Sequence, residues 1–185
     1  MLKKLSLIVL LCTITAGGVQ AAQNTALKGK TLYTQVNMYA HKGGSQISWV
    51  NFEVGTFIPV NSKVKVIQLF GKNITFKIIK SGKLVKLRNR PKHSGMDGKA
   101  WGIKHLNEKP LDLNQFSKAE RNAIRDGIIQ AGMSKEAVII SRGYPPAHKN
   151  PTLEAPQWLY WSNRSNKKVV SFDENGNVFG IRTFP

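Results

Sequence analysis

Hydrophobic and polar residues alternate along the first half of the chain with the period of a β-strand. The alternation is clearest in Val64-x-Val66 and in Ile74-x-Phe76-x-Ile78, because successive side chains of a strand lie on opposite faces. Glycine-containing turns separate these runs, as is typical of small all-β domains. We therefore predict a small β-barrel over residues 24–90 from the strand candidates KTLYTQVNMYA, SWVNFEV, SKVKVIQLF, NITFKII and KLVKLR.

The pattern changes to a helical period after residue 110. Ser117-Lys118-Ala119-Glu120 has the form of a capping box, the signature of a helix N-terminus. This helix is predicted to run to Gly132, with one apolar side formed by Ala123, Ile124, Ile128 and Ala131. A second helix is predicted from the N-cap Ser134 to Gly143, because glycine readily adopts the left-handed conformation that ends a helix.

Three strands are predicted to follow the second helix. Asn175-Gly176, between the apolar runs VVSF and VFGI, predicts a hairpin with a type I′ turn. Counting back from that turn places Phe172 opposite Phe179 and Val170 opposite Ile181, so these four side chains are expected to face the core.

The orientation of the first of these strands depends on the length of the turn that follows it. With Arg164-Ser165 at the tip of the turn, Leu159 and Trp161 face the core, and Trp158 and Tyr160 point the other way. A turn with an odd number of residues would exchange the two pairs.

Together these patterns predict an α+β protein with a basic β-barrel at residues 24–90 and an ααβββ domain at residues 111–185. Residues 91–110 contain Gly, Lys and Pro throughout and show no sustained period. We interpret them as a linker that forms an ordered connection. Part of it is expected to dock on a domain through Trp101, Ile103 and Leu106.

The string GMSKEAVIISRGYPP, followed by QWLYW and VVSFDENGNV, resembles the SmpA/OmlA (BamE-like) family of small bacterial outer-membrane assembly proteins. In that family a GMS motif opens the second helix, a G-x-P motif closes it, and a W-x-Y strand starts a three-stranded sheet. The resemblance covers roughly the last third of the chain. It implies an ααβββ domain, a location in the cell envelope and a non-catalytic role. The block GTFIPVNSKVKVI also resembles bacterial Src-homology-3-type barrels.

Residues 1–21 have the composition of a cleaved secretory signal peptide. Two lysines precede an apolar stretch that is too short to span a bilayer, and Val19-Gln20-Ala21 has the small residues of a cleavage site. The alternative is an uncleaved membrane anchor. The only cysteine, Cys12, follows a leucine where a lipoprotein signal needs a small residue. We therefore expect a periplasmic protein that could associate with the inner face of the outer membrane, without a lipid anchor, a disulfide or a transmembrane segment in its mature form.

The chain carries 28 Lys and Arg residues against 10 Asp and Glu, a net charge of +18 at pH 7. Residues 22–110 hold 16 basic and 3 acidic residues, whereas residues 111–185 hold 10 and 7. Because the sequence has no nucleic-acid-binding signature, we expect as partners the polyanions of the envelope, such as lipid or lipopolysaccharide phosphates, wall polymers or acidic proteins. The candidate polyanion-binding residues are Lys83, Lys86 and Arg88. The alternative is that the lysines only solvate the strand faces and keep sheet edges apart.

The sequence lacks the common catalytic motifs, among them Gly-x-Ser-x-Gly, His-Glu-x-x-His and a phosphate-binding glycine loop. His93 and His105, with Asp97 between them, could bind a metal, but their spacing is not that of an established zinc site. The alternative is two exposed histidines on a basic loop. We therefore expect no metal, no cofactor and no enzymatic activity.

Aromatic and arginine side chains dominate protein interfaces. The candidates for contact with a protein partner are Trp158, Tyr160, Arg164, Tyr144, Pro145 and Pro146. Alternatively, the barrel or the linker covers Trp158 and Tyr160, which then form an inter-domain core.

Two functions are compatible with this sequence. One is a non-catalytic binding or scaffold role related to outer-membrane protein assembly or envelope integrity. The other is a wall-associated or lipopolysaccharide-associated accessory protein or enzyme that holds an anionic polymer with its basic barrel. In either role the protein could associate peripherally with the membrane.

Overall fold

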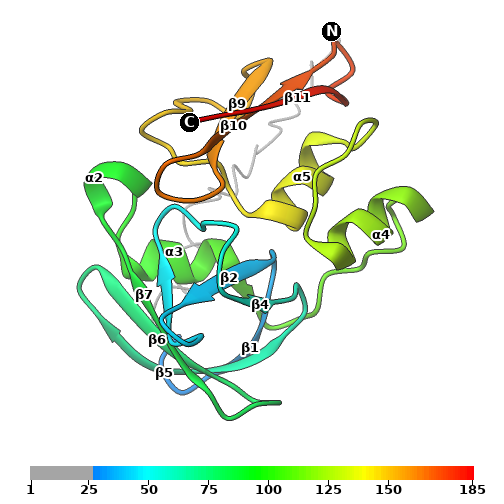
Figure 1. Cartoon of the computed structure of the whole chain (residues 1–185). Coiled ribbons are helices and arrows are strands. Elements are labelled where there is room, and N and C mark those ends of the chain that lie inside the picture. Colours follow the sequence, from blue (N-terminus) through cyan, green and yellow to red (C-terminus); the bar gives the residue numbers. More distant parts are fainter. Residues whose placement is uncertain (1–26) are drawn as a thin grey trace, which may run out of the picture.

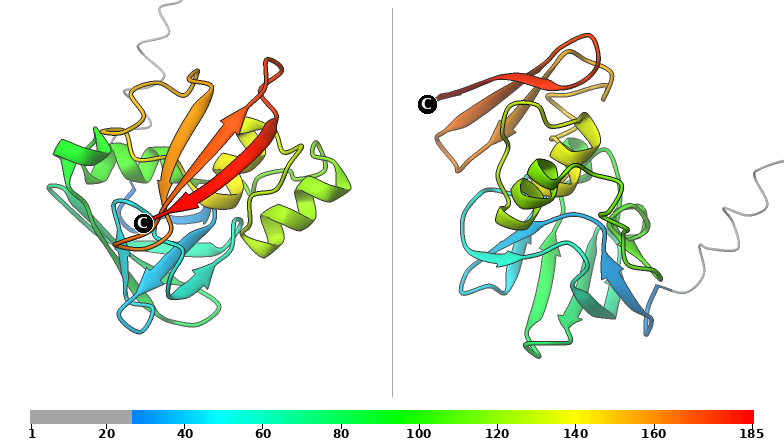
Figure 2. Two further views of the ribbon diagram at one scale, coloured as in Figure 1. Left: turned by 45° about the horizontal axis from the view of Figure 1, so that its top comes forward. Right: turned by 90° about the vertical axis from the view of Figure 1, so that its right-hand side faces the viewer.

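The computed structural model describes residues 27–185 and has a mixed α+β architecture (Figure 1). A curled eight-stranded sheet forms a half-barrel, and a three-stranded antiparallel sheet lies at the opposite end, with two helices between the sheets (Figure 2). The predicted signal peptide, residues 1–21, lies outside the described residues. In the described part of the chain, no helix combines the length and the apolar character needed to cross a membrane.

The large sheet has the strand order β4-β2-β3-β7-β6-β5-β1-β8. Its strands are β1 (Thr31–Thr34), β2 (Met38–His41), β3 (Gln46–Ser48), β4 (Thr56–Ile58), β5 (Lys63–Phe70), β6 (Asn73–Ile78), β7 (Leu84–Arg88) and β8 (Leu106–Asn107). All neighbours pair antiparallel except β3 and β7, which are parallel. The alternation noted in the sequence is confirmed: Val64, Val66, Ile74 and Phe76 are buried on the inner face.

The first strand candidate is broken into two strands by a buried polar residue. Asn37, between β1 and β2, donates hydrogen bonds to the carbonyls of Ile124 (2.6 Å) and Ser141 (3.1 Å) and accepts one from the Val60 amide (2.7 Å). These bonds connect the large sheet to the two helices. The candidate SWVNFEV is also wrong as a strand beyond residue 48, because Asn51 adopts a positive φ of 53° and the chain forms an irregular loop.

Residues 91–110, interpreted as a linker, contribute two short helices and a strand to the half-barrel. Helix α2 spans Pro91–Ser94, α3 spans Gly98–His105, and β8 pairs with β1. The predicted docking of Trp101 and Leu106 is confirmed, since both are buried in the core of the large sheet. A side chain at position 98 would meet the Asn73 backbone at 2.9 Å. The glycine therefore permits close packing of α3 on β6, which accounts for a composition that otherwise indicates a flexible segment.

Helices α4 and α5 have the N-terminal caps predicted from the sequence. In α4 (Lys118–Asp126) Ser117 and Glu120 form the capping box, and in α5 (Lys135–Arg142) Ser134 accepts a hydrogen bond from the Ala137 amide. The predicted end of α4 at Gly132 is wrong. The helix ends at Gly127, which has a φ of 68° and sits against the Tyr39 side chain, so Ile128 is exposed.

The small sheet has the order β11-β10-β9, with β9 at Gln157–Trp161, β10 at Lys167–Phe172 and β11 at Val178–Phe184. The loop between β9 and β10 has five residues, 162–166, so Trp158 rather than Leu159 pairs with Val170. The predicted orientation of β9 is therefore wrong. Trp158 and Tyr160 are buried beneath α5, and the Tyr160 hydroxyl donates to the Gly143 carbonyl at 3.0 Å.

The hairpin between β10 and β11 is present, but its turn differs from the predicted type I′. Asn175 does not have the positive φ that this turn requires, whereas Gly176 has a φ of 78°, and the Gly176 amide donates to the Asp173 carbonyl. This arrangement is a type I turn followed by a left-handed glycine. Val170 pairs with Ile181 as predicted, but a bulge pairs Phe172 with Val178 instead of Phe179. Val178 is consequently buried, whereas Phe179 and Ile181, both expected in the core, are exposed.

Residues 27–185 form two hydrophobic cores, one inside the half-barrel and one between the small sheet and the helices α4 and α5. Ile139 on α5 packs against both cores. Helix α5 therefore connects the two parts of the molecule.

Candidate functional site

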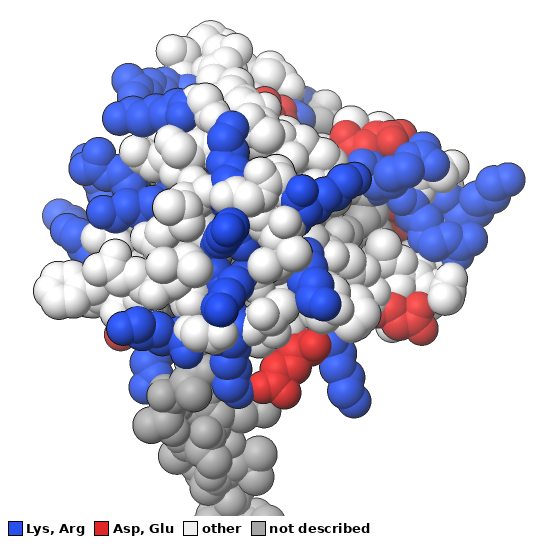
Figure 3. Space-filling model, turned by 90° about the horizontal axis from the view of Figure 1, so that it is seen from below, with Lys and Arg blue, Asp and Glu red and all other residues white. Residues whose placement is uncertain are grey.

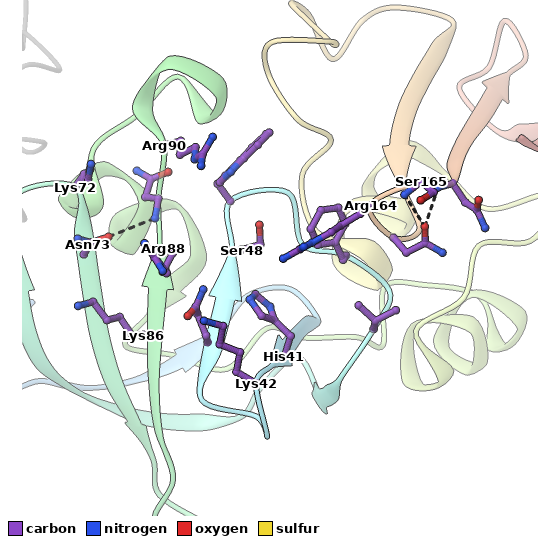
Figure 4. A pocket seen from close by; sticks show the side chains of 17 residues that line it. His41, Lys42, Ser48, Lys72, Asn73, Lys86, Arg88, Arg90, Arg164 and Ser165 are labelled. Carbon is purple, nitrogen blue, oxygen red and sulfur yellow. Dashed lines mark hydrogen bonds between the residues drawn. The ribbon is translucent and has the colours of Figure 1, made fainter. Parts of the chain in front are cut away.

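A wide groove lies between the outer face of the large sheet and the loop that joins β9 to β10 (Figure 4). It has a volume of about 1330 Å³ and is open to solvent. Six cationic side chains line it: Lys42, Lys72, Lys86, Arg88, Arg90 and Arg164. We call this site the basic groove.

The floor of the basic groove is formed by β7 and its parallel neighbour β3. Val85 and Leu87 point into the core, so the residues that alternate with them point outward. Lys86, Arg88 and Arg90 therefore form one row along the chain. Neighbours in this row are about 7 Å apart, since residues i and i+2 of a strand have that spacing. On β3, Gln46 pairs with Lys86 and Ser48 pairs with Arg88, which places uncharged hydrogen-bonding groups beside the cations.

The facing wall is formed by the loop over residues 49–55 and by the β9–β10 loop. The Glu53 amide donates to the Ser162 carbonyl at 2.9 Å, which joins the two loops. Arg164 reaches from the tip of the β9–β10 loop toward the strands (Figure 4). Residues far apart in the sequence therefore complete a single cationic surface.

An ion cluster behind this wall holds the loop over residues 49–55 in place. The Glu53 carboxylate lies 2.9 Å from Arg142 Nε on α5 and 2.6 Å from Lys168 Nζ on β10. Burial alone would raise the pKa of Glu53, but the attraction of Arg142 and Lys168 outweighs it, so this pKa lies below its ordinary value. Glu53 is therefore ionised at neutral pH and is engaged by cations that lie outside the basic groove.

The electrostatic character of the basic groove is uniformly positive. Among the residues the structure describes, no Asp or Glu lines it, and none of its six cations forms a salt bridge. The groove also contains His41, whose pKa is lowered first by burial and then by Lys42, Arg164 and Arg88. A neutral histidine surrounded by cations is expected to gain a proton when an anion binds, because the anion offsets that repulsion.

Aromatic side chains and amides provide the remaining contacts. Trp49 and Phe52 line the groove together with Asn73, Asn89, Asn163 and Asn166. The Trp49 ring is stacked on His93, with 4.6 Å between the ring centroids, and His148 packs edge-on against both rings. This mixture suits a ligand that carries anionic groups on a polar backbone with some flat surface.

The structure separates the residues that the sequence proposed for binding. Lys86, Arg88 and Arg164 come together in the basic groove, whereas Lys83 lies in the β6–β7 turn, where its ammonium donates to the Gly43 carbonyl. Trp158 and Tyr160 are core residues and cannot provide the expected outward surface. The other three lie near α3: Tyr144 is half-buried beneath Lys104, and Pro145 and Pro146 are buried.

Sequence reasoning missed Lys42, Lys72, Arg90 and Trp49. Arg90 continues the alternation of Lys86 and Arg88, so the spacing contained a signal for it. The other three come from turns and loops, whose position depends on the sheet curvature and on distant contacts.

The three residues considered for metal binding do not form a site. His93 stacks on Trp49, and His105 is buried against Trp101, where desolvation lowers its pKa to about 3. Asp97 instead caps α3 by accepting from the Ala100 amide at 2.8 Å. Over residues 27–185, no group of three His, Cys, Asp or Glu side chains is placed to hold a metal ion.

Comparison of the chain with protein-family models, curated proteins and solved structures gives no match.

Proposed function

We propose that this protein is a non-catalytic binding protein of the bacterial envelope, and that its basic groove holds a segment of an extended anionic polymer. The observation that supports this function is the convergence of six cations from four chain segments on one groove. The mutual repulsion of such cations is unfavourable, and an anionic ligand removes it. Phosphate or carboxylate groups spaced along a polymer would face the row formed by Lys86, Arg88 and Arg90.

The envelope location in this proposal comes from the signal-like residues 1–21 and from the resemblance to the SmpA/OmlA family. A scaffold role in outer-membrane protein assembly, which the sequence also predicts, is the alternative function. It retains the order of helices and strands in residues 111–185 as support. However, Trp158 and Tyr160, which were expected to form its binding surface, are buried in the core. The polymer-binding function therefore has the stronger support.

The test is a salt titration of polymer binding. Affinity for lipopolysaccharide and for a polyglycerol phosphate would be measured between low and physiological salt for the wild type and for Lys86→Gln/Arg88→Gln/Arg90→Gln. For an ion-exchange interaction, each lost cation–phosphate contact lowers the slope of log affinity against log salt by about 1. We expect the triple variant to reduce the slope by about 3.

A matched control removes the same charge elsewhere. Lys118→Gln/Lys149→Gln/Arg182→Gln changes three exposed cations outside the basic groove, so its slope should equal that of the wild type. An equal reduction of the salt slope in the two triple variants would mean that net charge alone drives binding, and would contradict a specific site in the basic groove. Tighter binding to a single-stranded oligonucleotide than to either envelope polymer would overturn the choice of ligand class.

A further inference from the structure

The β6–β7 turn, residues 79–83, forms the end of the half-barrel that lies farthest from the small sheet (Figure 1). Two large apolar side chains are exposed at its base, Ile79 at 46% and Leu84 at 54%. Lysines accompany them: Lys77 and Lys80 are exposed, and Lys83 donates to the Gly43 carbonyl. The hydrogen bond from Lys83 to Gly43 places the β2–β3 turn, which contains Lys42, at the same end of the molecule.

The lysines next to this turn are arranged at a cost to stability. Lys77 on β6 lies directly opposite Lys65 on β5 and on its other side pairs with Leu84. Like charges directly opposite each other on one sheet face repel. Figure 3 shows this end of the molecule from below, with Lys and Arg side chains spread among uncharged side chains and few carboxylates. The face therefore combines unfavourable repulsion with exposed apolar groups.

We propose that the β6–β7 turn contacts an anionic phospholipid bilayer, with Ile79 and Leu84 entering the headgroup region and the surrounding lysines facing the lipid phosphates. Amphipathic segments that lie in this interface combine buried apolar area with attraction to anionic lipid. A second copy of this chain would bring the same positive charge and is disfavoured. An anionic soluble polymer would satisfy the lysines but would leave both apolar side chains in water.

This surface adjoins the basic groove, because the two share β7 and because the groove residue Lys42 lies in the turn that Lys83 contacts, but the exposed apolar side chains Ile79 and Leu84 do not line the groove. Leu84 opens the strand, and the groove cations Lys86 and Arg88 follow on the same outer face. A bilayer at the turn would therefore leave the groove open, so a polymer could be held close to the membrane surface. The membrane contact itself does not depend on the polymer-binding proposal.

The test uses the full chain and vesicles of phosphatidylcholine alone or mixed equally with phosphatidylglycerol. Because residues 1–21 could also bind lipid, the decisive readout is local. An environment-sensitive fluorophore is attached at Ser81→Cys in a Cys12→Ser background. We expect a blue shift of its emission only with the anionic vesicles. Ile79→Ser/Leu84→Ser should weaken the vesicle affinity measured by this shift about tenfold.

Charge and apolar contributions are separated by further variants. Lys77→Gln/Lys80→Gln should weaken the same affinity about 30-fold at low salt, since each basic residue near an anionic surface contributes about fivefold. Ile128→Ser removes an equally exposed apolar residue after α4 and should have no effect. A shift that survives Ile79→Ser/Leu84→Ser unchanged, or one that soluble glycerol phosphate abolishes at equal phosphate, would overturn the proposal. Polymer binding in the basic groove should be intact in Ile79→Ser/Leu84→Ser, so failure of one proposal is distinguishable from failure of the other.

Discussion

The basic groove and the ion cluster around Glu53 use cationic side chains in opposite ways. In the groove, six cations are solvent-accessible, and none has a salt-bridge partner in the described chain. Behind the groove wall, Arg142 is fully buried, and it shares the Glu53 carboxylate with Lys168. The same residue types therefore stabilise the fold in one place and are available to a ligand in the other.

A single carboxylate makes this difference. A buried cation without its partner is strongly destabilising, whereas an exposed cation contributes little to folding. Removing Glu53 should thus affect stability, and removing a groove cation should affect binding.

The largest expected effect is that of Glu53→Gln. It leaves Arg142 buried without a counter-charge, which should lower the free energy of unfolding by about 3 kcal/mol. Urea denaturation of the purified protein measures this loss. Arg88→Gln, in the groove, should unfold at nearly the wild-type urea concentration. Comparable destabilisation by both substitutions would show that the groove cations are structural.

The contribution of Glu53 should also disappear in acid. The pKa of Glu53 is lower in the folded protein than in the unfolded chain. Its contribution is therefore complete above the ordinary carboxyl pKa and is lost as the pH falls through the folded value. Urea unfolding from pH 7 to pH 3 should show the difference between wild type and Glu53→Gln shrinking toward acid. A difference that stays constant with pH would assign the destabilisation to packing rather than charge.

A smaller effect of opposite sign is expected on the outer face of the large sheet. Lys77→Gln removes the repulsion with Lys65 and should raise the free energy of unfolding by about 0.5 kcal/mol. Thermal denaturation at low salt is the appropriate measurement, because salt screens the repulsion. Lys118→Gln, on the exposed side of α4, serves as the control. No gain in stability would mean that the two ammonium groups avoid each other in solution.

The smallest expected effect concerns the protonation of His41. Its lowered pKa and its cationic neighbours imply that polymer binding is accompanied by proton uptake, so affinity should rise as the pH falls. In His41→Gln this dependence should be weaker, with affinity at neutral pH nearly unchanged. Titrations at several pH values in one buffer of constant ionic strength measure it. An identical pH dependence in both proteins would exclude His41 as the coupled group.

Strands β7 and β9 show how much of the fold the sequence could predict. In β7, Val85 and Leu87 alternate with the charged residues Lys86 and Arg88, so the alternation correctly identifies these two cations as outward. In β9 both faces are apolar or aromatic, and nothing local decides between Trp158 and Leu159. The odd number of residues in the β9–β10 loop fixes which face of β9 is buried. The sequence does not show where β9 ends and β10 begins, so this loop length could not be predicted.

The basic groove was predictable only in part for a related reason. Its floor follows from the alternation of one strand, but its wall requires Glu53, Arg142 and Lys168 to meet from three distant segments. Arg164 was selected from the sequence as a contact for a protein partner, yet it faces the cations of β7. Composition identified the basic half of the chain correctly, whereas the position of the groove depends on how the small sheet overhangs the large one.

The parallel pairing of β3 with β7 has a consequence for how the chain folds. Strands β5, β6 and β7 form a meander of local hairpins, whereas β3 must pair with a strand some 40 residues later. Closing a loop of this size costs entropy before any contact compensates for it, and such non-local pairings slow folding. Until β3 arrives, β7 is an edge strand with unsatisfied backbone groups. Lys86 and Arg88 on this strand would repel other chains before β3 pairs with it, which disfavours edge-to-edge aggregation.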